Sequence, residues 1–252
     1  MFELIKSSST RIMTALALFA VFILVSYIDT LFVVWLFFGV FMIIGVDEAM
    51  KLFKVENTLI YQFAGITWII AYFYTQADDL IFVALVVFAS ILAYKRDIDK
   101  RIILPLLYPL ASFLFLLALY NGFGIRVLWW ILFIVASADV GAYYVGRSIG
   151  KTKFCETSPN KTIEGLIGGI ILAAILGPLF AIEQVSYFTA LLISLVVALS
   201  SVFGDLFESY LKREADVKDS GNILPGHGGV LDRTDGFLFA GIVMLVLLRA
   251  VV

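Results

Sequence analysis

The sequence predicts an all-α integral membrane protein that crosses the bilayer many times. Of its 252 residues, 62% are hydrophobic and only 15% are charged. The mean hydropathy is +1.03. Soluble domains are typically about 45–50% apolar and about 25% charged. The apolar residues also occur in long runs, and each run is about the length that a membrane-spanning helix needs.

Nine apolar runs are candidates for membrane spans, which need about 20 mostly apolar residues each. They are expected at Ile12–Ile28, Thr30–Ile44, Thr58–Thr75, Leu80–Tyr94, Ile102–Tyr120, Ile125–Gly146, Ile163–Ile182, Val185–Leu211 and Phe237–Val252. Only Asp29 and Thr30 lie at the junction of the first two runs, so these are expected to form a tight helical hairpin. The first run is too long for the apolar region of a secretory signal and is interpreted as a retained span. Gly177-Pro178 is expected to kink the seventh run.

The charges between the runs predict their orientation. Sixteen of the 18 Lys and Arg lie at the N-terminus or in the loops after every second run, and only Arg126 and Arg249 lie on the other side. The positive-inside rule therefore places the N-terminus in the cytoplasm and the C-terminus outside. We expect a multi-pass protein of the inner cell membrane, with the charged loops 147–162 and 212–236 facing the cytoplasm.

Two acids, Asp139 and Asp205, lie inside otherwise apolar runs. Carboxylates within a membrane are costly and commonly mark functional sites. Polar residues recur around both acids at spacings of three and four, which places them on one helix face each. The two sets are Ser201, Asp205, Glu208, Ser209 and Lys212, and Asp139, Tyr143 and Arg147. Both acids lie at a similar depth, so the two polar faces are expected to form a cleft open to the cytosol.

The most polar segment, 209–235, lies between the last two apolar runs and contains the only His, His227. Asp232 and Asp235 offer the oxygen ligands that Mg²⁺ prefers alongside substrate phosphates. Adjacent glycines would let backbone N–H groups approach phosphate oxygens closely. These glycines and the basic residues of the segment complete an expected anion site: Lys212, Arg213, Lys218, Arg233, Gly228 and Gly229.

A second basic and hydroxyl-bearing segment opens the seventh run with Ser158, Lys161 and Thr162. The amides at the start of a helix can also bind an anion. The glycines that follow at 165–169 are expected to permit close helix packing. Together the two segments indicate a cytosol-facing, metal-dependent phosphate site, but they do not choose the reaction.

The order of these residues resembles the phosphatidate cytidylyltransferase (CDP-diacylglycerol synthase) family. The matching motifs are Ser209-x-Leu-Lys-Arg213, Lys218-Asp219, Leu224-Pro-x-His-Gly-Gly-Val-x-Asp-Arg-Thr-Asp235, Asp139-x-Gly-Ala-Tyr143, Gly146-Arg147 and Ser158-Pro-x-Lys-Thr-x-Glu-Gly165. The resemblance covers roughly residues 136–236, and the first five runs are similar only in length and hydrophobicity. Asn160 stands where Lys is common, and Gly236 stands where Ser is common.

This resemblance implies that the chain joins CTP to phosphatidic acid, giving CDP-diacylglycerol and pyrophosphate. It implies Mg²⁺ bound by Asp205, Asp232 and Asp235, with a second ion that is divalent or monovalent, such as K⁺. Catalytic roles are expected for Asp205, Asp232, Lys212 and Arg233. Substrate contacts are expected for Arg213, Lys218, Asp219, His227, Gly228, Gly229, Ser158, Lys161, Thr162 and Asp139.

The expected partners are CTP, phosphatidic acid, membrane lipids and a second copy in a homodimer, with no nucleic acid. The chain is expected to divide into N-terminal helices at 1–135 and a catalytic region at 136–252.

Two other functions stay open at this point. The first is related lipid chemistry: a CTP-dependent kinase of the polyprenol type, or a cytidylyltransferase that acts on another lipid phosphate. A kinase would release CDP, whereas a cytidylyltransferase would release pyrophosphate. The second is an ion-coupled transporter, which should place its acids near the midplane with access from both sides. Here the polar residues gather toward one side of the membrane, which disfavours transport.

Overall fold

The fold is built from helices, as the composition predicts. The structure, a computed structural model, describes the backbone of residues 2–95 and 97–252 and the side chains of 12–95 and 97–252. Within these ranges there is no β-strand, and the extended pairing is limited to two isolated bridges, Lys153 with Thr162 and Leu224 with Gly228. The predicted all-α membrane class is confirmed.

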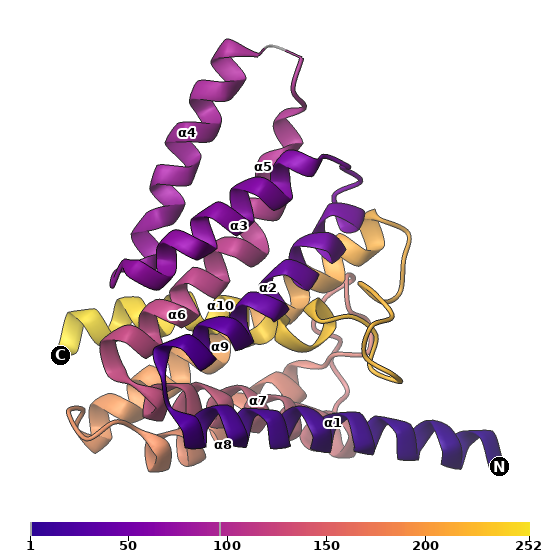
Figure 1. Ribbon diagram of the computed structural model, residues 1–252. Coiled ribbons are helices and arrows are strands. Elements are labelled where there is room, and N and C mark those ends of the chain that lie inside the picture. The colour runs from indigo at the N-terminus through magenta and orange to yellow at the C-terminus, as the bar shows by residue number, and fades with distance from the viewer. Residues whose placement is uncertain (1, 96) are drawn as a thin grey trace. The chain divides into compact units, whose positions relative to one another are not determined.

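The helices follow the predicted apolar runs closely (Figure 1). In chain order they are α1 (Phe2–Ile28), α2 (Leu31–Leu52), α3 (Thr58–Phe73), η1 (Ala77–Asp79), α4 (Leu80–Tyr94), η2 (Lys100–Ile102), α5 (Ile103–Pro105), η3 (Leu106–Leu110), α6 (Ala111–Phe123), α7 (Ile125–Ile149), α8 (Ile163–Leu176), η4 (Gly177–Phe180), α9 (Tyr187–Glu214) and α10 (Leu231–Val251). Seven helical segments of the described chain are long and apolar enough to cross a membrane, and two apolar stretches, Ile12–Ile28 and Thr58–Phe73, are shorter. The number of crossings and their orientation stay predictions.

Three helices extend well past the apolar runs that predicted them. The first run was expected to begin at Ile12, but α1 begins at Phe2. The second run was expected to end at Ile44, but α2 continues to Leu52. The ion pair between Lys51 and Asp47, one turn apart with Nζ and Oδ2 separated by 2.5 Å, supports this extra length. The ninth run was expected to begin at Phe237, but α10 begins at Leu231. Hydropathy detects only the apolar part of a helix, so polar first and last turns were assigned to loops.

Irregular helix geometry occurs where the sequence has proline or a tight connection. Pro109 lies within the π-helical segment η3, because proline lacks the N–H that a regular α-helix needs. The regular α8 helix ends before Gly177-Pro178, so the predicted break is confirmed. Asp29, at φ 42°, makes the short turn between α1 and α2.

The chain divides into two compact units, and the expected functional regions 1–135 and 136–252 stay a prediction. One contains the described residues up to Leu117 together with Glu214–Arg233, and the other contains Ala118–Arg213 and Thr234–Val252. We call them the N-terminal unit and the catalytic-motif unit. The polar loop after α9 therefore packs with N-terminal helices, which its sequence position alone did not indicate.

In the catalytic-motif unit, α7 and α8 pack with their backbones in direct contact. A Cβ atom on Gly169 would lie 2.4 Å from the carbonyl oxygen of Ala138, and one on Gly165 would lie 2.7 Å from that of Ala142. No side chain fits in that space, so the expected packing role of these glycines is confirmed. This contact holds the loop between the two helices close to the end of α7.

Candidate functional site

A cavity of about 750 Å³ lies in the catalytic-motif unit. Its walls come from α7, from the loop that precedes α8 and from α9. The polar residues around it are Asp139, Tyr143, Arg147, Ser158, Asn160, Lys161, Thr162 and Asp205. All three residues of the polar face expected on α7 border this cavity, whereas Asp205 is the one residue of the face expected on α9 that does so.

Asp205 is held by donors on both of its carboxylate oxygens. The ammonium of Lys161 lies 2.6 Å from Oδ2, and both side chains are partly buried. The hydroxyl of Ser209, one turn later on α9, donates to Oδ1 over 3.4 Å. Ion pairs away from bulk water are less screened than exposed ones. Lys161 is therefore the counter-ion of Asp205 in this structure.

The first turns of α10 bring Asp235 into the same unit. The charges of Asp205, Asp139 and Lys212 all act on its carboxylate. Its Oδ1 accepts a hydrogen bond of 2.8 Å from the amide of Gly236. Asp235 was expected in a loop, but it lies on a helix, because α10 begins earlier than the hydropathy indicates.

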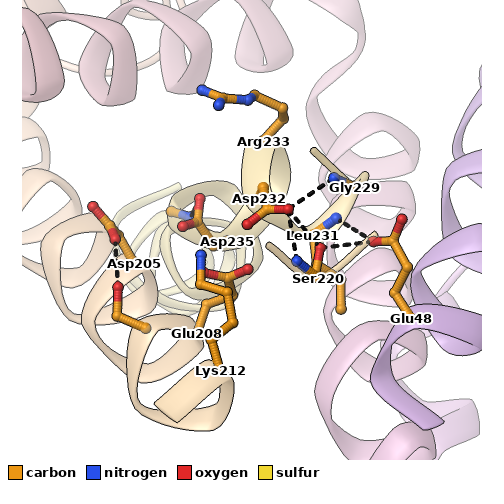
Figure 2. Close-up of polar contacts among 12 residues, drawn as sticks. Glu48, Asp205, Glu208, Lys212, Ser220, Gly229, Leu231, Asp232, Arg233 and Asp235 are labelled. Atoms are coloured by element: carbon orange, nitrogen blue, oxygen red, sulfur yellow. Dashed lines mark hydrogen bonds and ion pairs between the residues drawn. The ribbon is translucent and has the colours of Figure 1, made fainter. Parts of the chain in front are cut away.

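Lys212, expected to bind phosphate, is paired with a carboxylate of its own helix. Its ammonium contacts Glu208, one turn earlier on α9, and the Glu208 side chain is 0% exposed (Figure 2). A buried carboxylate needs a positive partner nearby, since an unpaired charge is costly in such surroundings. Glu208 therefore competes with any substrate phosphate for this lysine.

The loop before α8 is anchored at its end by Thr162. Its Oγ1 accepts a hydrogen bond of 3.1 Å from the amide of Gly165, which caps the helix. Glu164 ties the loop further, because its carboxylate accepts from the amides of Lys151 and Thr152 at 3.2 Å. These contacts fix the loop that carries Ser158 and Lys161 to the cavity wall.

The donor set of this cavity suits a hard cation, because carboxylate oxygens are the ligands that Mg²⁺ prefers. Asp139 and Asp205 line the cavity, and Asp235 interacts electrostatically with both. Within residues 12–95 and 97–252, however, no three His, Cys, Asp or Glu side chains are gathered closely enough to hold a metal. The chemistry fits Mg²⁺, whereas a closed ligand shell is not assembled.

In the N-terminal unit, Asp232 organises the loop that precedes α10. Its Oδ2 accepts hydrogen bonds from the amide of Ser220 at 2.8 Å, the hydroxyl of Ser220 at 2.9 Å and the amide of Gly229 at 2.7 Å (Figure 2). Gly228, at φ +82°, adopts a backbone conformation that favours glycine, and a Cβ there would lie 2.5 Å from the same Oδ2. Gly228 therefore leaves room for the carboxylate of Asp232.

The charged residues of this loop and of the end of α9 are more exposed than Asp232. The Nε of Arg233 donates to the carbonyl of His227 over 3.1 Å, and the Arg233 side chain is exposed. Lys218 and Asp219 are exposed in the loop, and Arg213 is exposed in the last turn of α9. These four side chains are accessible, but the described contacts do not place them at the cavity.

Comparison with known proteins covers nearly the whole chain. Residues 9–251 match the model of the cytidylyltransferase family. The chain belongs to this family.

Two members of the family are similar to this chain over different lengths. The phosphatidate cytidylyltransferase of Helicobacter pylori strain J99 is 43% identical over 249 residues, which is 98% of this chain and 93% of that protein. The phosphatidate cytidylyltransferase of Bacillus subtilis is 49% identical over 123 residues, which is 47% of this chain and 46% of that protein. Similarity to the first relative extends through the N-terminal helices, which the motifs alone did not cover.

Glu48, which none of the sequence motifs includes, lies at the centre of the hydrogen bonds that hold the loop before α10. Glu48 is only 2% exposed and accepts hydrogen bonds from Ser220, Val230 and Leu231. Its signal in the sequence was an acid four positions after the expected end of an apolar run at Ile44, in a stretch that hydropathy assigned to a loop. Glu208 was expected on a polar helix face, but its pairing with Lys212 was not.

Proposed function

We propose that this chain transfers the cytidylyl group of CTP to phosphatidic acid, giving CDP-diacylglycerol and pyrophosphate. The observation that carries the proposal is near full-length similarity to a relative named phosphatidate cytidylyltransferase. The cavity bordered by Asp139, Asp205 and Lys161 supports it, because a reaction between two anionic phosphates needs both metal-binding oxygens and cations.

The proposed reaction is an in-line displacement at phosphorus. A phosphate oxygen of phosphatidic acid attacks the α-phosphorus of CTP and forms the new phosphorus–oxygen bond. The bond between that phosphorus and the bridging oxygen breaks, and pyrophosphate leaves with the electron pair. Alignment and charge neutralisation supply most of the catalysis. A phosphate monoester is already anionic near neutral pH, so no general base is required.

We assign Mg²⁺ binding in the catalytic-motif unit to Asp205 and Asp235, with Asp139 on the cavity wall. Bound Mg²⁺ would neutralise phosphate charge and orient the reacting groups. Lys161 would exchange Asp205 for a substrate phosphate, since the ammonium already lies at the cavity. Arg147 is a further phosphate-binding candidate, because it borders the same cavity and its Nη1 donates to the Tyr143 hydroxyl over 2.9 Å.

The roles of the N-terminal unit's residues rest on their motif. Asp232 is proposed as a metal ligand, and Arg233 as a phosphate-binding residue. A second ion, a homodimer and an inner-membrane location also remain proposals. The bias of Lys and Arg toward one side supports a site that faces the cytoplasm, where CTP is present.

The proposal is tested by incubating purified protein with CTP, Mg²⁺ and phosphatidic acid and measuring pyrophosphate release and the lipid product. Omission of each component in turn should stop the reaction. Release of CDP in place of pyrophosphate would establish a kinase and overturn the proposal. Activity with polyprenyl phosphate but not with phosphatidic acid would overturn the lipid assignment.

A further inference from the structure

Glu48, near the end of α2, binds the loop and helix start that lie more than 170 positions later in the chain. The amide of Val230 donates to its Oε1 over 2.9 Å, and that of Leu231 donates to its Oε2 over 2.8 Å. The hydroxyl of Ser220 also donates to Oε2, over 3.1 Å (Figure 2). All four residues belong to the N-terminal unit, and Glu48 is buried.

These bonds cap α10 from outside its own sequence. The first amides of a helix have no acceptor within the helix, and a negative charge at that end is favourable. Capping residues are usually Ser, Thr, Asp or Asn next to the helix start, but Val230 stands there. Glu48 supplies the acceptor instead, so the start of α10 depends on the position of α2.

The backbone around Glu48 is built to admit its carboxylate. A Cβ atom on Gly221 or on Gly229 would lie 2.5 Å from Oε1 of Glu48. Real Cβ atoms essentially never approach so closely, so a side chain at either position would force the buried Glu48 carboxylate to move. Gly229, which belongs to the His-Gly-Gly motif, therefore leaves space for this internal carboxylate.

Ser220 connects Glu48 to Asp232. Its hydroxyl lies 3.1 Å from Oε2 of Glu48 and 2.9 Å from Oδ2 of Asp232. A hydroxyl has one proton to donate, so the two carboxylates share it. The Ser220 amide also donates to Asp232 over 2.8 Å. Any displacement of Glu48 is therefore transmitted to Asp232 through Ser220 and through the first turn of α10.

We propose that Glu48 is a positioning residue: it sets where α10 begins and thereby orients Asp232 and Arg233. This inference rests on the proposed function for its effect on turnover. The cap itself is a property of the folded chain and can be measured without substrate.

The test compares Glu48→Gln with Glu56→Gln. Glutamine has nearly the same size, but it keeps one acceptor oxygen and presents an NH₂ group toward the amide donors. Hydrogen exchange at the amides of Val230 and Leu231 should become about tenfold faster, and turnover should fall about tenfold. The KM for CTP should change less than about threefold, because orientation and not ground-state binding is lost.

Glu56→Gln is the matched control. It makes the same substitution in the connection between α2 and α3 of the same unit, but the Glu56 side chain is exposed. Exchange at Val230 and Leu231 and turnover should both stay at the wild-type level. Faster exchange together with lower turnover in the control would show that the loss of any nearby carboxylate has the same effect, and would overturn the proposal.

Other outcomes decide between the two proposals. Glu48→Gln with wild-type exchange at Val230 and Leu231 would overturn the positioning role, whatever its turnover. Faster exchange in a protein whose wild type does not convert CTP and phosphatidic acid would support the cap and refute the proposed function. Should Glu48→Gln fail to fold, Ser220→Ala serves instead: the proposal requires reduced turnover with an unchanged KM for CTP, and wild-type turnover would overturn it.

Discussion

Replacing Asp232 with asparagine separates the structural from the catalytic contribution of this carboxylate. Its Oδ2 accepts three hydrogen bonds, at 2.8, 2.9 and 2.7 Å. A hydrogen bond to a charged group contributes about 1.5–3 kcal/mol, and a neutral one about 0.5–1.5 kcal/mol. Asparagine keeps an acceptor oxygen but not the charge, so each bond loses about 1 kcal/mol. The expected decrease in the free energy of unfolding is about 3 kcal/mol. It is somewhat smaller than this sum because Glu48 no longer faces a second negative charge.

The assay measures unfolding in detergent without nucleotide and pyrophosphate release at saturating substrate. Asp232→Asn should unfold at a lower temperature. It should also turn over at least about 100-fold more slowly, because Asp232 is proposed to bind the Mg²⁺ that neutralises phosphate charge. Asp216→Asn is the control: its side chain is 93% exposed in the same loop, and asparagine tolerates its φ of 58°. Wild-type stability of Asp232→Asn would refute the hydrogen-bond reasoning, and near-normal turnover would refute the catalytic assignment.

Three further substitutions and one metal removal test the cavity, its packing and its metal dependence. Asp205→Asn should abolish turnover of radiolabelled CTP while the protein still inserts into the membrane; a variant with normal activity would contradict the assignment of Asp205. Lys161→Gln should raise the KM for CTP about tenfold, because one charge-assisted contact to phosphate is lost, and an unchanged KM would remove Lys161 from the site. Gly169→Val should cost about 3 kcal/mol of stability, since a Cβ would meet the Ala138 carbonyl at 2.4 Å, whereas Gly65→Ala, in open space, should not destabilise. Chelation of Mg²⁺ with EDTA should stop pyrophosphate release until excess Mg²⁺ is added, and a constant rate would disprove metal dependence.

Much of the fold could be predicted because membrane helices are encoded by local composition. Each apolar run coincides with a helix, and the break at Gly177-Pro178 follows from the missing proline amide. The polar faces of α7 and α9 were predictable too, since helical spacing alone places Asp139 and Asp205 on them. The ends of α2 and α10 were not, because polar turns continue these helices through pairing and capping contacts.

The charge partners in the candidate site could not be predicted from the sequence. Asp205 was expected to bind metal, but its nearest charge is Lys161, which lies 44 positions earlier. Lys212 was expected at phosphate, but it pairs with Glu208. The convergence of Asp205 with Asp232 stays a prediction, since the two residues belong to different compact units.

The amino-acid sequence by itself determined the membrane class, the positions of the helices and the kinds of side chain available for phosphate chemistry. These properties depend on composition and spacing within about 20 neighbouring residues. Only the tertiary structure decided that Glu48 caps α10, because Val230 lies 182 positions away along the chain. A hydrogen bond requires its donor and acceptor to lie within about 3 Å, and for distant residues that distance is set by how the helices pack.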